Sequence, residues 1–420
     1  MAPCVHAPRP GGPATLAARL PTTSHTLSTA LRTEPSGLPA QIAQAIDAAG
    51  GWLPFDQFMH LALYAPGRGY YAGGAPTFGL RASDGSDFVT APELSPLFGR
   101  ALAAQVAESL AMTGTDEVWE FGAGSGALAA SVLDELARLG QPVRRYVIVD
   151  VSSTLRARQQ QRLAAHAGTV QWASALPAAL RGVLIGNEVL DAMPVKLLAR
   201  HGGAWHERGV ALARTAAASD EKTGSRPVHR AQSAIKKEAN SFLWQDRLTP
   251  LRPPAEVAGA HDYVTEIHPQ AEAFMATVAE ALARGGAGAA FFIDYGFPEA
   301  EYYHPQRATG TLACHQAHRM DDDPLANPGA KDITAHVNFT GVALAAQNAG
   351  LHVLGYTSQA RFLLNCGIAH LMEAADLPTR ANAMKLLAEH EMGELFKVIA
   401  LGTHAWLPRG FAEGDRTHRL

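Results

Sequence analysis

Cysteine is scarce in this sequence, which contains only Cys4, Cys314 and Cys366 among its 420 residues. Their wide spacing matches neither a disulfide framework nor the close cysteine pairs of a zinc site. Cysteine usage of this kind is typical of proteins from a reducing compartment. We therefore predict neither a disulfide framework nor a bound metal.

Charge is sparse as well, since Asp, Glu, Lys and Arg make up only 18% of the residues, below the usual quarter. The formal net charge of −4 supplies no basic surface for nucleic acid. No uninterrupted apolar run approaches the length that spans a membrane. We therefore expect no nucleic-acid partner and no membrane insertion.

Acidic residues are absent from residues 1–33, which contain Arg9, Arg19 and Arg32. Such a leader could be an organelle transit peptide, but its many prolines disfavour the amphipathic helix that such peptides form. We expect residues 1–36 to be a disordered tail of a cytoplasmic bacterial protein. A mitochondrial matrix protein with a transit peptide is the alternative.

The glycines at 122, 124 and 126 mark the most informative stretch, residues 118–128. Apolar residues and Glu120 precede them, and an Ala/Leu run follows, which predicts a buried strand, a tight turn and a helix start. Glycine tolerates positive φ and lets a ligand approach the backbone closely. The same spacing also fits a dinucleotide-binding fingerprint, or a strand, turn and helix without any ligand.

Strand and helix patterns alternate from residue 117 onward, which predicts a parallel α/β sheet. We expect strands at 117–121, 145–150, 169–172, 182–186 and 289–293, and an antiparallel edge pair at 351–356 and 396–402. Polar side chains gather where these strands end, namely Glu120, Asp150, Asn187, Glu188, Asp191 and Asp294. Open α/β sheets bind ligands at that edge.

The remaining segments divide the chain further. Residues 37–112 form an N-terminal helical and lid region, in which Ser95 caps a helix and 85–95 could close over a ligand. We predict the core at 113–194 and 268–405, separated by an insertion lobe at 195–267, and a C-terminal tail at 406–420. Within the lobe we expect a hairpin at 195–212, an Ala/Ser/Lys-rich excursion at 213–240 and irregular structure at 241–267. Long loops are expected at 298–339, a helix capped by Thr340, and helical structure at 359–391.

An adenosine-containing cofactor would fit these residues. The glycine turn permits close approach, and Asp150 stands where an acceptor for ribose hydroxyls belongs. Glu120, directly before the turn, suits a cation better than a pyrophosphate, because a carboxylate stabilises positive charge. This favours S-adenosyl-L-methionine, which carries a sulfonium and an ammonium, over NAD. An NAD-dependent dehydrogenase stays open as the alternative.

Six segments together resemble the MidA/NDUFAF7-type S-adenosylmethionine-dependent methyltransferases: Gly85–Leu102, Glu120–Leu128, Gly186–Val195, Ile293–Phe297, Gly310–Leu312 and Asp332–Phe339. Two departures are Ser86, inserted between Gly85 and Asp87, and Asn338, where Asp is common. The resemblance implies a class I methyltransferase core, which is a Rossmann-like seven-stranded sheet, with an extra lobe from the N-terminal helices and the insertion. It also implies cofactor contacts from Asp87, Thr90, Pro92 and Glu93.

The mitochondrial members of that family methylate an arginine of a respiratory complex I subunit to symmetric dimethylarginine and support complex assembly. By resemblance we expect a protein substrate here, and a homodimer is possible. Carboxylates can orient a guanidinium, so Glu188 and Asp191 are the first catalytic candidates, with Asp294 next. Asp332 and His336 complete the pocket, with His336 as a proton acceptor. Tyr70, Tyr71 and Phe88 could wall the cleft. A non-catalytic assembly factor that binds the cofactor is the remaining alternative.

Overall fold

The computed structural model describes residues 37–73, 90–150, 153–213, 241–316 and 319–420, all within one unit of the chain. The predictions for the tail 1–36, for Asp87 and Phe88, and for nearly all of the excursion 213–240 lie outside the described residues. No helix in the described ranges combines the length and the apolar character needed to cross a bilayer.

An α/β sheet forms the core, as the strand and helix alternation predicts, but it has eight strands where the resemblance implies seven. Seven strands lie side by side in the order β15-β16-β10-β5-β2-β3-β4, and the short β14 pairs only with β10. Their bounds are β2 Glu117–Phe121, β3 Arg145–Val149, β4 Val170–Ala173, β5 Gly182–Asn187, β10 Gly288–Phe297, β14 Val337–Asn338, β15 His352–Ser358 and β16 Phe396–Gly402. Strands β4, β3, β2, β5 and β10 are parallel, and β16 is antiparallel to both of its neighbours.

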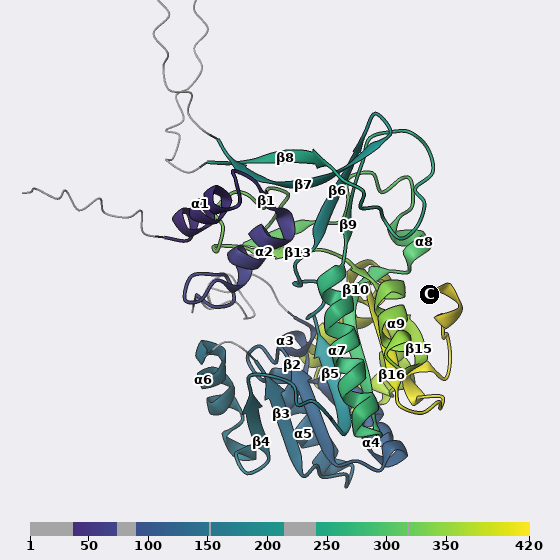
Figure 1. Cartoon of the computed structure of the whole chain (residues 1–420). Coiled ribbons are helices and arrows are strands. Elements are labelled where there is room, and N and C mark those ends of the chain that lie inside the picture. The colour runs from purple at the N-terminus through teal and green to yellow at the C-terminus, as the bar shows by residue number, and fades with distance from the viewer. Residues whose placement is uncertain (1–36, 74–89, 151–152, 214–240, 317–318) are drawn as a thin grey trace, which may run out of the picture. The chain divides into compact units, whose positions relative to one another are not determined.

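Helices cover both faces of this sheet (Figure 1). On one face lie α4 Pro96–Thr113 and α5 Ala127–Arg138, and on the other α7 Pro269–Gly285 and α9 Phe339–Asn348. Successive side chains of a strand point to opposite faces. Phe291 therefore packs against the α4 side and Phe292 against the α7 side, and both are fully buried. The strands read as continuous apolar runs because helices bury both faces.

Helix ends follow local chemistry. Ser95 caps α4 as predicted, since its Oγ accepts a hydrogen bond from the backbone N–H of Leu97 at 3.3 Å. The prediction that Thr340 caps α9 is wrong. Asn338 is the cap and accepts from the N–H of Gly341 at 3.3 Å, while the Thr340 hydroxyl accepts from the N–H of Glu299. The departure from Asp to Asn at 338 therefore keeps a capping side chain.

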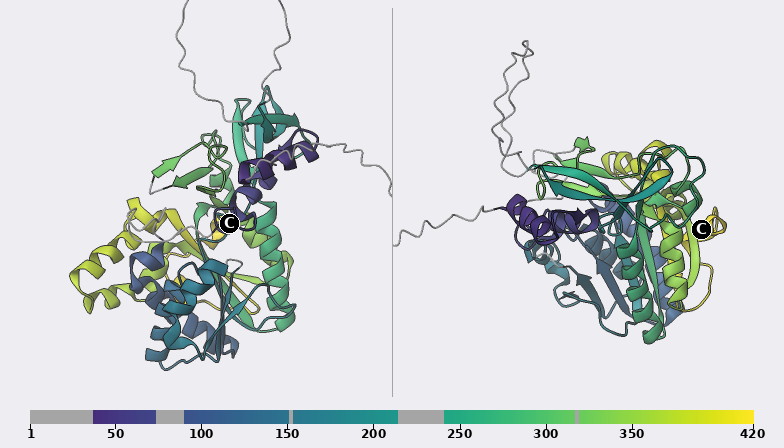
Figure 2. Two further views of the ribbon diagram at one scale, coloured as in Figure 1. Left: turned by 90° about the vertical axis from the view of Figure 1, so that its left-hand side faces the viewer. Right: turned by 45° about the horizontal axis from the view of Figure 1, so that its top comes forward.

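The insertion forms a second sheet with the N-terminal region. Its five strands are β1 Leu53–Pro54, β6 Lys196–His201, β7 Ala204–Leu212, β8 Phe242–Leu248 and β9 Tyr263–Ile267. Helices α1 Leu38–Ala48 and α2 Phe55–Tyr64 lie beside these strands, as further views show (Figure 2). The hairpin expected at 195–212 is confirmed. The expectation of irregular structure at 241–267 holds only for 249–262. It is wrong at the two ends, where β8 and β9 pair with the two hairpin strands.

Residues 298–339 are also more ordered than expected. After α8 Glu299–Tyr302, the strands β11 Ala313–Gln316, β12 Arg319–Asp321 and β13 Asp332–Thr334 make a three-stranded sheet. Cys314 and Ile333 pack into the apolar cluster of α1 and α2. The buried Lys331 binds the Asp321 carboxylate at 2.8 Å. Neither contact is visible as a local sequence pattern.

The C-terminal part breaks the helical stretch expected at 359–391 into α10 Gln359–Asn365, α11 Ile368–Glu373 and α12 Leu377–Leu387. Gly367, at φ 88°, separates the first two, and Asp376 caps the third through the N–H of Thr379. A single π-helical turn, Glu389–Gly393, precedes β16. The last residues return to β15, where the N–H of Arg416 donates to the carbonyl of Tyr356.

Candidate active site

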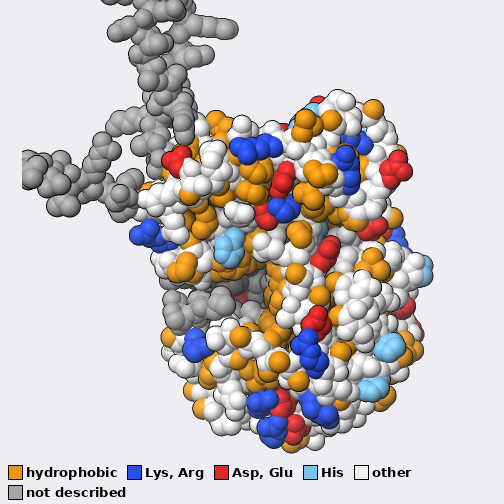
Figure 3. All heavy atoms as spheres, in the orientation of Figure 1, with side chains coloured by type: hydrophobic (Ala, Val, Ile, Leu, Met, Phe, Trp, Pro, Cys, Tyr) orange, Lys and Arg blue, Asp and Glu red, His pale blue; other side chains and the backbone are white. Residues whose placement is uncertain are grey.

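A cavity of about 880 Å³ opens at the carboxyl ends of β2, β3 and β5, where the sequence predicted a ligand site. Figure 3 shows a hollow on this face with apolar side chains along its rim. The cavity brings together thirteen of the predicted residues: Tyr71, Thr90, Pro92, Glu93, Glu120, Gly122, Gly124, Asp150, Asn187, Glu188, Asp191, Asp332 and His336. Gly126 and Asp294 do not line it, and Asp87 lies outside the described residues.

The glycine turn forms the floor of one end. Gly122 and Gly124 have φ values of 59° and 52°, in the left-handed region that favours glycine. A Cβ at Gly122 would lie 3.3 Å from the Val189 side chain, so the cradle has little room for one. Gly126, at φ 86°, caps α5 and faces Gln159 and Leu163, which explains why it does not line the cavity.

Glu120 stands buried directly beneath this turn, with 2% of its surface exposed. The hydroxyl of Tyr146 donates to its Oε2 at 2.6 Å. Burial raises the pKa of the Glu120 carboxyl to about 8, a net value that includes the lowering effect of the Tyr146 hydrogen bond and a smaller raising effect of Asp150. A cation bound beside Glu120 would favour its charged form, so this residue fits a positively charged cofactor.

Asp150 is held by a side chain that no motif identified. Nε2 of Gln159 donates to Asp150 Oδ2 at 2.8 Å and to the carbonyl of Gly124 at 3.0 Å. The side-chain oxygen Oε1 of Gln159 accepts a hydrogen bond from Nε1 of Trp172 at 2.9 Å. One amide therefore fixes the carboxylate relative to the glycine turn. This arrangement fits an adenosine-containing ligand whose ribose hydroxyls need an acceptor.

Glu93, near the end of the predicted lid 85–95, bonds to the same turn through Ser125. It lies on α3 Ala91–Leu94, and its Oε1 accepts hydrogen bonds from the Ser125 hydroxyl and, at 2.9 Å, from Arg162. Arg162 also donates to the Ser125 hydroxyl. The Glu93 carboxylate thus lines the cavity while it holds α3 against the glycine turn.

Glu188 has an unusual backbone, since its φ of 55° is left-handed although it is not a glycine. Such strain persists where the surroundings enforce it, often at functional sites. Nδ2 of Asn187 donates to Glu188 Oε1 at 2.9 Å. Burial raises the pKa of the Glu188 carboxyl to about 8, and the nearby Asp191 adds to the effect.

Asp191 also lines the cavity. The hydroxyl of Tyr295 donates to its Oδ2, whereas Oδ1 is buried and has no hydrogen-bond partner within the described ranges. Burial raises the pKa of Asp191 to about 6. Asp294 lies behind the cavity wall and accepts backbone N–H groups of Val189, Leu190 and Asp191 through Oδ2. The geometry therefore gives Asp294 the task of holding this loop.

Aromatic side chains from the N-terminal region wall the other end. Tyr64 and Tyr71 line the cavity and stack with ring centroids 5.6 Å apart. The Tyr71 hydroxyl donates to Asp332 Oδ1, and the Tyr64 hydroxyl to the carbonyl of Ala192, both at 2.9 Å. Tyr70 instead packs in the apolar core of this region. Tyr71 therefore walls the cavity, as predicted, whereas Tyr70 does not.

His336 reaches the cavity from the segment between β13 and β14. Its ring packs edge-on against Tyr295, with centroids 5.2 Å apart. Burial lowers the pKa of His336 to about 4, with smaller contributions from Arg307 and Lys397. The imidazole is therefore neutral near pH 7. Its Nδ1 is buried and lacks a hydrogen-bond partner among the residues that the structure describes.

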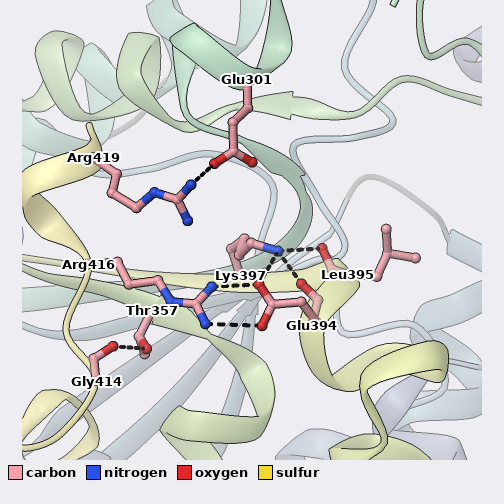
Figure 4. A network of polar contacts seen from close by, with 8 residues as sticks. All are labelled: Glu301, Thr357, Glu394, Leu395, Lys397, Gly414, Arg416 and Arg419. Carbon is pink, nitrogen blue, oxygen red and sulfur yellow. Dashed lines mark hydrogen bonds and ion pairs between the residues drawn. The ribbon is translucent and has the colours of Figure 1, made fainter.

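The last wall comes from residues that the sequence did not single out, Met392, Leu395 and Phe396. A polar network supports them (Figure 4). Nζ of Lys397 donates to the carbonyls of Glu394 and Leu395, and Arg416 forms a two-pronged ion pair with the Glu394 carboxylate. No sequence motif signals this contact, because 22 residues separate the two partners.

Comparison with known proteins agrees with this geometry. A model of the family described as S-adenosyl-L-methionine-dependent methyltransferases matches residues 101–357. The human protein arginine methyltransferase NDUFAF7 is 26% identical over 384 residues, covering 84% of this chain and 81% of that protein. Its Drosophila melanogaster homolog is 27% identical over 386 residues, with coverage of 84% and 82%.

A solved structure is more similar still. The crystal structure of a Burkholderia thailandensis protein bound to S-adenosyl-homocysteine is 48% identical, with a TM-score of 0.82, and the match covers 91% of this chain and 96% of that one. The resemblance to the MidA/NDUFAF7-type enzymes is thereby confirmed, and the NAD-dependent alternative is set aside. The chain belongs to the family of S-adenosyl-L-methionine-dependent methyltransferases.

Proposed function

We propose that this methyltransferase modifies an arginine side chain of a protein. The observation that supports it best is the acidic lining of the cavity. Six acidic side chains line it, namely Glu93, Glu120, Asp150, Glu188, Asp191 and Asp332, and no Lys or Arg does so among the described residues. Such a wall favours a cationic substrate beside a cationic cofactor. The relatives named protein arginine methyltransferases agree with this choice.

Each residue then has a task that follows from its position. Glu188 and Asp191 line the cavity, and their carboxylates bind the guanidinium. Arginine is almost always charged in water, so it must release a proton as it is methylated. The neutral His336 has one unprotonated ring nitrogen, which can receive that proton.

The cofactor end is defined by the glycine turn, Glu120 and Asp150. S-adenosyl-L-methionine, when bound there, supplies the methyl group from its sulfonium. The protein contributes mainly by positioning, because methyl transfer needs an in-line approach more than acid or base strength. The aromatic wall of Tyr64 and Tyr71 is suited to enclosing the planar guanidinium.

The substrate can be identified in cells. We expect mass spectrometry of wild-type and gene-deletion strains to show an arginine that carries symmetric dimethylation only when the gene is present. Subunits of respiratory complex I are the first to inspect, with the protein in the cytoplasm as its proposed location. An Asp191→Asn variant should fail to restore the mark.

Two results would contradict the proposal. One is a missing methyl group on a residue other than arginine in the deletion strain. The other is full restoration of both the arginine mark and growth by Glu188→Gln and Asp191→Asn together, which would favour a non-catalytic assembly factor.

A further inference from the structure

The backbone of His336 is held on both sides by side chains. Its N–H donates to Oγ1 of Thr311 at 3.0 Å. Its carbonyl accepts from Nε2 of His268 at 2.9 Å. The preceding N–H, of Ala335, donates to the carbonyl of Asp191 at 3.0 Å. The strap that carries His336 is therefore tied both to the Asp191 loop and to two side chains from outside the core sheet.

The Thr311 hydroxyl bonds directly to a buried carboxylate, Glu266 of β9, at 3.2 Å, and His268 is connected to the same carboxylate through the Tyr302 hydroxyl. Oε1 of Glu266 accepts the backbone N–H groups of Thr311 and Leu312 at 2.8 and 3.1 Å. Its Oε2 accepts the hydroxyl of Tyr302 at 2.9 Å, and that hydroxyl lies beside both Thr311 Oγ1 and His268 Nε2. Glu266 therefore fixes the loop that presents the Thr311 hydroxyl.

Gly310 shows how closely this loop approaches the carboxylate. It has a φ of 76°, and a Cβ there would lie 2.4 Å from Glu266 Oε1. The loop can wrap the carboxylate only because this position has no side chain. The Gly310–Leu312 segment thus has a physical reason for its glycine that is separate from the cofactor.

The proton on His268 can be assigned from its partner. A carbonyl only accepts, so Nε2 of His268 must carry the proton that it donates to His336. Burial lowers the pKa of His268 to about 4, which keeps the ring neutral and preserves this tautomer. The His268 ring also packs edge-on against Tyr302, with centroids 5.1 Å apart.

The His336 ring itself has few polar constraints. It packs between Tyr295 and Phe297, and its Nδ1 has no partner in the described part of the chain. Its place in the cavity is therefore set by its backbone. None of Glu266, Thr311, His268 and Tyr302 lines the cavity.

We propose that Glu266, Thr311, His268 and Tyr302 form a positioning network that sets where the His336 imidazole stands in the cavity. Its effect on methyl transfer rests on the proposed role of His336, whereas its effect on the ring position does not. The network acts on the substrate end, because it holds the backbone of His336, whereas Tyr146 and Gln159 bind the Glu120 and Asp150 carboxylates at the cofactor end.

A matched pair of variants tests this. Thr311→Val keeps the side-chain shape but removes the hydroxyl, and Thr311→Ser keeps the hydroxyl. We expect Thr311→Val to move the His336 ring toward solvent, so that its pKa rises toward the ordinary value of about 6.5. NMR titration measures this, and His336→Gln identifies the signal among the 18 histidines. Arg307 and Lys397 face the ring from other segments and are unchanged in both variants.

Activity and cofactor binding are then compared. Transfer of tritiated methyl groups to extract proteins of the deletion strain should fall at least about tenfold in Thr311→Val and recover in Thr311→Ser. Calorimetric binding of S-adenosyl-homocysteine should change less than about twofold, as a displacement confined to the substrate end requires. An unmoved His336 pKa in Thr311→Val, or an equal loss of S-adenosyl-homocysteine binding, overturns the network. Full transfer by His336→Gln contradicts the catalytic role of His336 instead, and the NMR result still decides the positioning.

Discussion

Burial raises the pKa of carboxyl groups in the cavity. Glu120 and Glu188 are both largely removed from water and have pKa values raised to about 8. A buried carboxyl that lacks a cation is held in its neutral form. Both residues line the cavity where we propose that the cationic cofactor and substrate bind, so each is poised to release a proton when that charge arrives.

Glu120 should make cofactor binding release a proton. Below about pH 8 the free protein carries a neutral Glu120, which ionises when the sulfonium binds, so affinity should rise with pH and level off above pH 8. Calorimetry in buffers of different ionisation enthalpy measures the released protons. The wild type should release more than Glu120→Gln near pH 7. Equal release by the two proteins would show that Glu120 does not sense the cofactor charge.

Glu188 should limit stability at neutral pH. A carboxyl whose pKa is raised on folding costs stability as pH rises from its ordinary value near 4.5 to about 8, because the unfolded chain ionises first. Glu188→Gln removes that cost, so we expect it to gain roughly 1 to 2 kcal/mol at pH 7 while transfer falls. Thermal unfolding at pH 4 and pH 7 checks this, and the gain should be small at pH 4. A variant that is less stable at pH 7 contradicts the argument.

Among the elements, the strand and turn before α5 could be predicted to the residue. Strand 117–121 is bounded by polar residues and by glycines whose left-handed φ values only glycine adopts easily. These residues are adjacent in the sequence, so the strand and the turn could be predicted from the sequence alone. The strands β8 and β11 escaped prediction because most of their side chains are only partly buried or exposed, so their sequences show no clear apolar pattern.

The cap of α9 is instructive for the same reason. Asn338 and Thr340 are both good capping residues, and only the end of β14 decides which one stands at the helix start.

In the cavity, local sequence patterns identified the strand-end acids and glycines. Gln159, Met392 and Leu395 could not be recognised, because packing of distant segments brings them to the site.

The glycine turn should tolerate no branched side chain. Gly124→Val forces a β-branched residue to φ 52° on the cavity floor, so we expect S-adenosyl-homocysteine binding to fall at least about a hundredfold. Gly202→Val is the matched control. It carries the same backbone strain at φ 55° in the open β6–β7 turn and should keep full affinity. Comparable calorimetric affinities for the two variants would remove the turn from the binding site.

Across the whole molecule, the cavity is closed by parts that are distant in sequence. The N-terminal region supplies Tyr64, at the end of α2, and Tyr71, in the turn after it. The three-stranded sheet supplies His315 and Met320, and the segment before β16 supplies Met392 and Leu395. The core sheet alone makes only the cofactor end. The substrate end is therefore an outcome of the complete fold, which explains why its walls were the hardest part to foresee.

The C-terminal residues should tune the substrate end without touching it. Arg416→Leu leaves the Glu394 carboxylate without its two-pronged partner, so the Met392–Phe396 wall should loosen and KM for the protein substrate should rise severalfold. Affinity for S-adenosyl-homocysteine should not change. Arg419→Leu is the control, because Arg419 pairs with Glu301 and not with this wall (Figure 4). If both variants raise KM equally, the wall is not the cause.

The return of residues 414–416 along β15 also bears on self-association. β15 is the edge strand of the central sheet, and an open edge invites pairing with another chain. Here Tyr356 bonds through its N–H to Asp415 and through its carbonyl to Arg416, and the Thr357 hydroxyl donates to Gly414. Its amides are thus already shielded at this point. Any dimer of this methyltransferase must consequently dock through surfaces other than this strip of the sheet margin.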